Sequence, residues 1–126
     1  MNSISLKPEL TELYSVNEFI LNKIGRENFQ VDLIIEEVFV NIVNYSKSDF
    51  IKVNAQFEAP ILIIEFIDNG MEFNPLLKED PETPQSIEDT KIGGLGIFLT
   101  KELSDEIDYH YTNGENHLKI IKNVKE

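Results

Sequence analysis

The chain has 126 residues and a formal net charge of −12 at pH 7, so a basic surface for nucleic acid or an anionic membrane is not expected. It has no cysteine and two histidines, which excludes thiolate metal sites and cysteine nucleophiles and disfavours a histidine-rich metal cluster. No apolar run resembles a signal peptide or a membrane span, and we expect one cytoplasmic domain over residues 1–126 with a protein or small-molecule partner.

The first predicted elements are a short strand and an amphipathic helix. Residues 3–6 alternate between polar and apolar side chains, which predicts an edge strand that ends before Pro8. The helix is predicted over residues 9–24 from apolar side chains at helical spacing, at Leu13, Val16, Ile20 and Ile24. Gly25 ends it, because glycine readily adopts the left-handed conformation at a helix C-terminus.

The second predicted helix covers residues 28–46, with Asn28 as its N-cap. Its apolar face is formed by Val31, Ile34, Ile35, Val38, Phe39 and Ile42. This face predicts a helix packed against the core of the domain.

A polar stripe on the same helix is unusual. Glu37, Asn41 and Asn44 lie on one line, four and then three residues apart, and Leu33 and Val40 flank them. Polar groups buried among hydrocarbon cost roughly 1–3 kcal/mol each unless they find partners. The residues alone leave two interpretations open, hydrogen bonds to neighbouring elements or a ligand site.

The pattern then changes to that of strands. Residues 51–57 alternate and residues 61–67 are almost continuously apolar, which predicts an antiparallel hairpin with the second strand more central. The tripeptide Asp68-Asn69-Gly70 follows. Taken locally it is a turn, in which Asp and Asn bond to the backbone and Gly accepts a positive φ.

A proline-containing segment and a glycine-rich segment come next. Residues 76–92 lack apolar periodicity and carry an acidic excess, so a functional lid is expected rather than a plain connector. The glycines of residues 93–96 lead into a predicted helix over residues 97–103. A glycine-rich helix start favours phosphate binding, but close packing against another helix explains it as well.

The last predicted unit is a hairpin of strands 107–111 and 117–121, joined through Asn113-Gly114. Both histidines lie on it, where structural roles are expected. Together the elements predict an α+β fold, a two-layer α/β sandwich with a mostly antiparallel mixed sheet and helices on one face.

Three short motifs, in this order, resemble the nucleotide-binding boxes of the GHKL superfamily, which includes gyrase, histidine kinases and anti-sigma serine kinases. They are Glu37-xxx-Asn41 on a helix, Asp68-x-Gly70 after a strand and Gly94-x-Gly96 at the opening of a helix. The resemblance extends over roughly residues 28–123. It implies the Bergerat ATP-binding fold with ATP and Mg²⁺ as ligands.

The resemblance also implies a role for these residues. Asn41 would hold Mg²⁺ at the ATP phosphates, Asp68 would accept a hydrogen bond from the adenine amino group, and Gly70 would let the base approach. Gly94 and Gly96 would wrap the phosphates. The remaining implied nucleotide contacts are Asn44, Lys91 and Leu95.

Within the superfamily the chain is most similar to the anti-sigma factor kinases. Histidine kinases usually carry asparagine where this chain has Glu37, whereas branches that activate a hydroxyl or water keep a carboxylate as general base. The chain also lacks a helical hairpin with a phosphoacceptor histidine and is too short for the gyrase transducer domain. This resemblance implies phosphorylation of a serine on an anti-sigma antagonist protein, sequestration of a sigma factor and, by analogy, a homodimer.

Two departures from the family pattern leave a non-catalytic alternative open. Glu72 stands where a second glycine is common, and the segment 76–92 contains no arginine. Only Lys78 and Lys91 could therefore approach phosphate from that segment, as point charges. The alternative is a nucleotide-sensing module that binds a sigma factor or another regulator without transferring phosphate.

Overall fold

The computed structural model describes residues 2–77 and 94–125. In chain order the elements are β1 (Ser3–Leu6), the short 3-10 helix η1 (Leu10–Glu12), α1 (Leu13–Ile24), α2 (Phe29–Tyr45), β2 (Ile51–Glu58), β3 (Ile61–Asp68), the 3-10 helix η2 (Pro75–Leu77), α4 (Gly94–Leu103), β4 (Glu106–Thr112) and β5 (Glu115–Asn123). Most of the predicted lid, with Lys78 and Lys91, lies outside the described residues.

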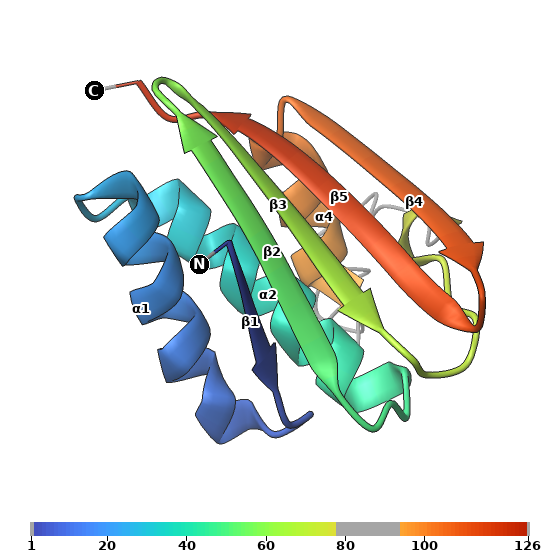
Figure 1. Ribbon diagram of the computed structural model, residues 1–126. Coiled ribbons are helices and arrows are strands. Elements are labelled where there is room, and N and C mark those ends of the chain that lie inside the picture. The colour runs from blue at the N-terminus through green and yellow to red at the C-terminus, as the bar shows by residue number, and fades with distance from the viewer. Residues whose placement is uncertain (1, 78–93, 126) are drawn as a thin grey trace.

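The strands form one sheet in the order β1-β2-β3-β5-β4, and every pairing between the described strands is antiparallel. The helices α1, α2 and α4 lie on one face of this sheet (Figure 1). Asn113 and Gly114, both with positive φ, make the turn between β4 and β5. The predicted α+β sandwich and both predicted hairpins are confirmed, but the sheet of the described strands is wholly antiparallel rather than mixed.

One core joins α1 and α2 to the sheet. The apolar face predicted for α2 is buried, and Phe39 and Ile35 are fully enclosed. Alternate residues of β2 and the central strand β3 meet this face, among them Val53 and Phe66, because successive side chains of a strand point to opposite sides. No helix within the described residues is long and apolar enough to cross a membrane.

The helix ends follow local chemistry. Gly25 has a φ of 86° and its N–H donates to the carbonyl of Leu21 at 2.7 Å, as expected of a left-handed C-cap. Asn28 caps α2 by accepting from the N–H of Val31 at 3.0 Å. The start of α1 differs from the prediction, since Glu9 is extended and a 3-10 turn precedes the α-helix.

The glycine motif lies at the opening of a helix, as predicted, but this helix begins at Gly94 rather than at residue 97. Helix α4 already begins at Gly94, so the backbone of Gly94 and Gly96 belongs to its first turn rather than to a loop before it. Helix α4 packs against α2. The two helices that carry the first and third predicted nucleotide motifs are therefore neighbours.

Candidate functional site

Asp68 ends the central strand β3 and is 3% exposed. Its Oδ1 accepts hydrogen bonds from the Ser46 hydroxyl, from the N–H of Gly70 at 2.9 Å and from Nδ2 of Asn116 at 3.0 Å. Within the described residues no donor reaches Oδ2. The carboxylate is thus fixed through one oxygen, while the other can accept a hydrogen bond from a ligand amine.

Asn116 on β5 is the residue that holds this carboxylate in place, and the sequence reasoning missed it. Asn116 is Asp68's partner in the β3–β5 register and is 5% exposed. Its Oδ1 accepts from the N–H of Phe73 at 3.0 Å and from the hydroxyl of Tyr109 at 2.5 Å, and its Nδ2 also donates to the carbonyl of Met71 at 2.9 Å. The side chain therefore ties the segment after β3 to the neighbouring hairpin.

Gly70 packs against the end of α2. A Cβ at Gly70 would lie 2.0 Å from the hydroxyl oxygen and 2.1 Å from the carbonyl oxygen of Ser46. Met71 N–H donates to that same carbonyl at 2.9 Å. Gly70 does not have the positive φ expected from a turn, so it is the close approach of Ser46 that requires glycine here.

The polar stripe of α2 is divided by burial. Asn41 is 2% exposed, and its Oδ1 has no hydrogen-bond partner among the described residues. Glu37 is partly buried, and burial, with a smaller contribution from the charge of Glu36, raises the pKa of its carboxyl above the ordinary 4.5. Asn44 is exposed. Only Asn41 therefore combines burial with an unsatisfied oxygen.

A hollow brings Asn41 and Asp68 together. About 330 Å³ of space, open solvent included, lies between α2, β3 and the β4–β5 hairpin. Its walls are mainly apolar and include Val38, Ile42 and Phe66. Apolar walls with a few fixed polar groups, Asp68 among them, are the kind of lining typical of a small-molecule site.

The structure brings some of the predicted site residues together and not others. Among the described residues, Asn41 and Asp68 line the hollow, whereas Glu37, Asn44 and Gly70 do not. The backbone of Gly94, Leu95 and Gly96 opens α4, the helix beside α2. Lys91 lies outside the described residues. Ser46 and Asn116 complete the site without having been predicted.

Asn41 fits the requirements of a Mg²⁺ ligand. An unpartnered amide oxygen buried among apolar side chains costs roughly 1–3 kcal/mol, and a bound cation would remove that cost. Amide and phosphate oxygens are the hard ligands that Mg²⁺ prefers. The residue that the resemblance assigns to Mg²⁺ therefore has the chemistry to hold it.

Comparison with known proteins gives the family to which this fold and site belong. The model of the histidine kinase-like ATPase domain matches residues 6–122. The chain belongs to this family, whose members in general bind ATP with Mg²⁺. Comparison with curated proteins finds no match.

Solved histidine kinase structures share the fold. The catalytic domain of histidine kinase ThkA has a TM-score of 0.58 at 11% identity, with 98% of each chain covered. Histidine kinase AdeS of Acinetobacter baumannii has a TM-score of 0.57 at 12% identity, covering 100% of this chain and 69% of that chain. The histidine kinase domain of the blue-light activated histidine kinase EL346 of Erythrobacter litoralis has a TM-score of 0.52 at 15% identity, covering 91% and 60%. At these identities the likeness concerns the fold alone.

Proposed function

We propose that the protein is an ATP-dependent protein-serine kinase of the anti-sigma type, which phosphorylates an anti-sigma antagonist protein and sequesters a sigma factor. The observation that carries the proposal is the carboxylate of Glu37, one helical turn before Asn41 on α2, with a pKa raised by burial. A base with a raised pKa accepts a proton more readily from a serine hydroxyl.

Each site residue has a part in this chemistry. Asp68 would accept from the exocyclic amine of adenine through Oδ2, and the apolar walls of the hollow would exclude water around the base. Asn41 would hold Mg²⁺, which neutralises phosphate charge when bound. Glu37 would take the proton of the serine hydroxyl while the serine oxygen attacks the γ-phosphorus of ATP. ADP would be the leaving group.

A second candidate is a nucleotide-sensing module that binds its regulator without transferring phosphate. Glu72 favours it, because this exposed carboxylate is close enough to Tyr109, which lines the hollow, to contribute to the raised pKa of the phenol. A negative charge near the nucleotide opposes the binding of a phosphate group. Both candidates act in the cytoplasm, where ATP is available, and both allow a homodimer.

Transfer of labelled phosphate tests the proposal. Wild-type protein, Glu37→Gln and the matched control Glu58→Gln, on an exposed residue at the end of β2, are each incubated with Mg²⁺, ATP labelled in its γ-phosphate and a desalted lysate of the source cell. We expect the wild type and Glu58→Gln to label a phosphoserine-containing band above the lysate background. Labelling of the same band by Glu37→Gln should be about 10²–10⁴-fold slower.

Two results would count against the kinase. If the wild type binds ATP but labels no protein beyond the background, the nucleotide-sensing module is preferred. If Glu37→Gln labels the same band at the wild-type rate, Glu37 is not the general base.

A further inference from the structure

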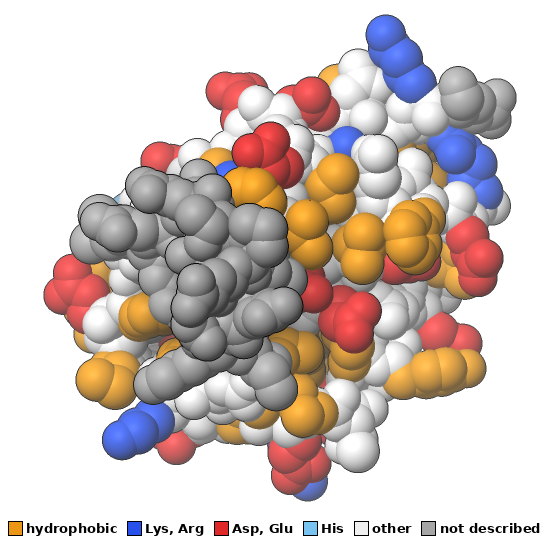
Figure 2. Space-filling model, turned by 180° about the vertical axis from the view of Figure 1, so that it is seen from behind, with side chains coloured by type: hydrophobic (Ala, Val, Ile, Leu, Met, Phe, Trp, Pro, Cys, Tyr) orange, Lys and Arg blue, Asp and Glu red, His pale blue; other side chains and the backbone are white. Residues whose placement is uncertain are grey.

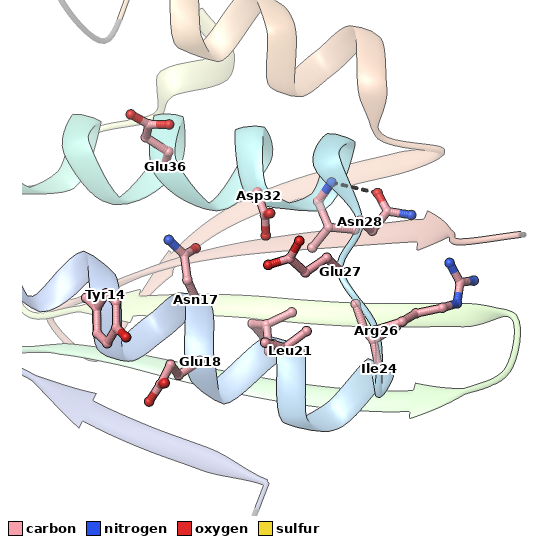
Figure 3. A pocket seen from close by; sticks show the side chains of 12 residues that line it. Tyr14, Asn17, Glu18, Leu21, Ile24, Arg26, Glu27, Asn28, Asp32 and Glu36 are labelled. Atoms are coloured by element: carbon pink, nitrogen blue, oxygen red, sulfur yellow. Dashed lines mark hydrogen bonds between the residues drawn. The ribbon is translucent and has the colours of Figure 1, made fainter.

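A second depression lies between α1 and α2, away from the nucleotide hollow. We call it the α1–α2 groove (Figure 3). It contains about 790 Å³ of space, open solvent included, and none of the described residues lines both this groove and the hollow around Asp68. The proposed nucleotide chemistry therefore does not account for it.

The floor of the groove is apolar. Ile20 and Val31 are core residues that form part of it, and Leu21 and Ile24 line it beside them. Tyr14 stands at the edge with 72% of its surface exposed. Figure 2 shows hydrophobic and acidic side chains next to one another on the helical side of the molecule. Exposed apolar surface within a polar rim is typical of an interaction site.

The rim of the groove is acidic. Glu18, Glu27, Asp32 and Glu36 all line it. Figure 3 shows Glu27 and Asp32 pointing into the space between the helices. Burial raises the pKa of Asp32, and the charge of Glu27 adds to the shift. A cation placed between these carboxylates would relieve their repulsion.

Asn17 of α1 adds a second polar feature to the groove. Its side chain points toward α2 in Figure 3, and its buried Oδ1 has no hydrogen-bond partner among the described residues. An ammonium or guanidinium group would supply the missing donor. Among the described residues, the one basic side chain that lines the groove is Arg26, which donates to the carbonyl of Val124 at 2.6 Å.

We propose that the α1–α2 groove is a docking site for a segment of a partner protein in which a lysine or arginine is flanked by apolar residues. The basic group would lie between Asp32, Glu27 and Asn17, and the apolar side chains would cover Leu21 and Tyr14. This inference rests on the proposed function in that it locates the surface a partner would use. Its test contains no ATP, so the docking site and the kinase activity can fail separately.

Peptide binding tests the groove. The probe is a fluorescent synthetic peptide of leucine and lysine spaced for an amphipathic helix, titrated by anisotropy at 0.15 M salt. The groove variant is Glu27→Gln/Asp32→Asn. The matched control, Glu106→Gln/Asp108→Asn, makes the same charge change on exposed residues of β4. We expect the groove variant to bind about tenfold more weakly than wild type and the control to bind within about twofold.

The apolar contribution is tested separately. Tyr14→Ala, and a probe with alanine for leucine, should each weaken binding by about fivefold or more. Equal loss in the groove variant and the β4 control would show attraction by net charge alone and would overturn the proposal, as would no binding by the wild type. A protein that sediments as a dimer, and as a monomer after Tyr14→Asp, would assign the groove to a second copy of the chain instead.

Discussion

Asn116 donates a hydrogen bond of 3.0 Å to the carboxylate of Asp68, its cross-strand partner on the central strand. The same amide group holds the backbone of Met71 and Phe73. Asn116 therefore positions the carboxylate to which the proposed function assigns the adenine amine. The family resemblance assigns Asn116 itself no contact with the nucleotide.

The first prediction concerns Asn116. Asn116→Ala removes the donor to Asp68 and leaves buried backbone groups without partners, which should lower the free energy of unfolding by about 1–3 kcal/mol. ATP affinity should also fall by about tenfold, because Asp68 gains rotational freedom. Urea denaturation and calorimetry measure the two effects. The control Asn54→Ala changes an amide that bonds Glu65 at 3.3 Å and lines neither the hollow nor the groove. An unchanged ATP affinity in Asn116→Ala would contradict its positioning role.

The second prediction concerns the adenine contact. Asp68→Ala should weaken ATP binding by about 2–4 kcal/mol, because a buried charge-assisted hydrogen bond is lost. Calorimetric titration with ATP measures this. Asp108→Ala, a change of the same type on an exposed residue of β4, should leave the affinity unaltered. Equal ATP affinities of the two variants would show that adenine does not bind at Asp68.

The third prediction separates packing from ligand contact at Gly70. Gly70→Ala should destabilise the fold by about 1–3 kcal/mol, because the new methyl group would overlap the Ser46 backbone. Ser46→Ala should not rescue it, since the carbonyl oxygen lies 2.1 Å from the added carbon. Unfolding in urea measures both variants. If Gly70→Ala is fully stable but no longer binds ATP, glycine is required there for the close approach of adenine rather than for packing against Ser46.

The fourth prediction is a pH dependence at Glu37. Its folded-state pKa is raised above 4.5 by burial and by Glu36, so the native state binds the proton more tightly than the unfolded state. The contribution of Glu37 to stability is therefore greatest below pH 4.5 and declines as pH rises through the folded-state pKa.

Glu37→Gln has no such titration. Relative to the wild type, this variant should gain stability between pH 4 and pH 7, measured as a difference in urea midpoints. A constant difference across that range would contradict a raised pKa at Glu37. Glu58→Gln, a change of the same type on an exposed residue at the end of β2, is the control.

Much of this fold could be predicted because its signals are local. The apolar face of α2, the Asn28 cap, the Gly25 stop and the Asn113-Gly114 turn each depend on residues within a few positions of one another. The start of α1 was predicted too early, because apolar spacing does not distinguish a 3-10 turn from the first turn of an α-helix.

The site was only partly predictable for the opposite reason. Asn116 lies 48 residues from Asp68 in the chain, and its role arises from the β3–β5 register, which no local pattern reveals. Ser46 and Gly70 likewise meet only in the folded chain, so the requirement for glycine was attributed to a turn or to a ligand rather than to packing. Periodicity placed Asn41 and Asn44 on one stripe but could not show that Asn41 is buried and Asn44 exposed.

The most direct test of the account is a calorimetric titration of ATP with and without Mg²⁺, in the wild type and in Asn41→Ala. We predict that the wild type binds ATP, that Mg²⁺ strengthens this binding, and that Asn41→Ala loses the Mg²⁺ effect because the buried amide oxygen is gone. No heat from the wild type at millimolar ATP, or an Asn41→Ala protein that keeps the full Mg²⁺ effect, would contradict the assignment of Asn41 and Asp68 to a single nucleotide site.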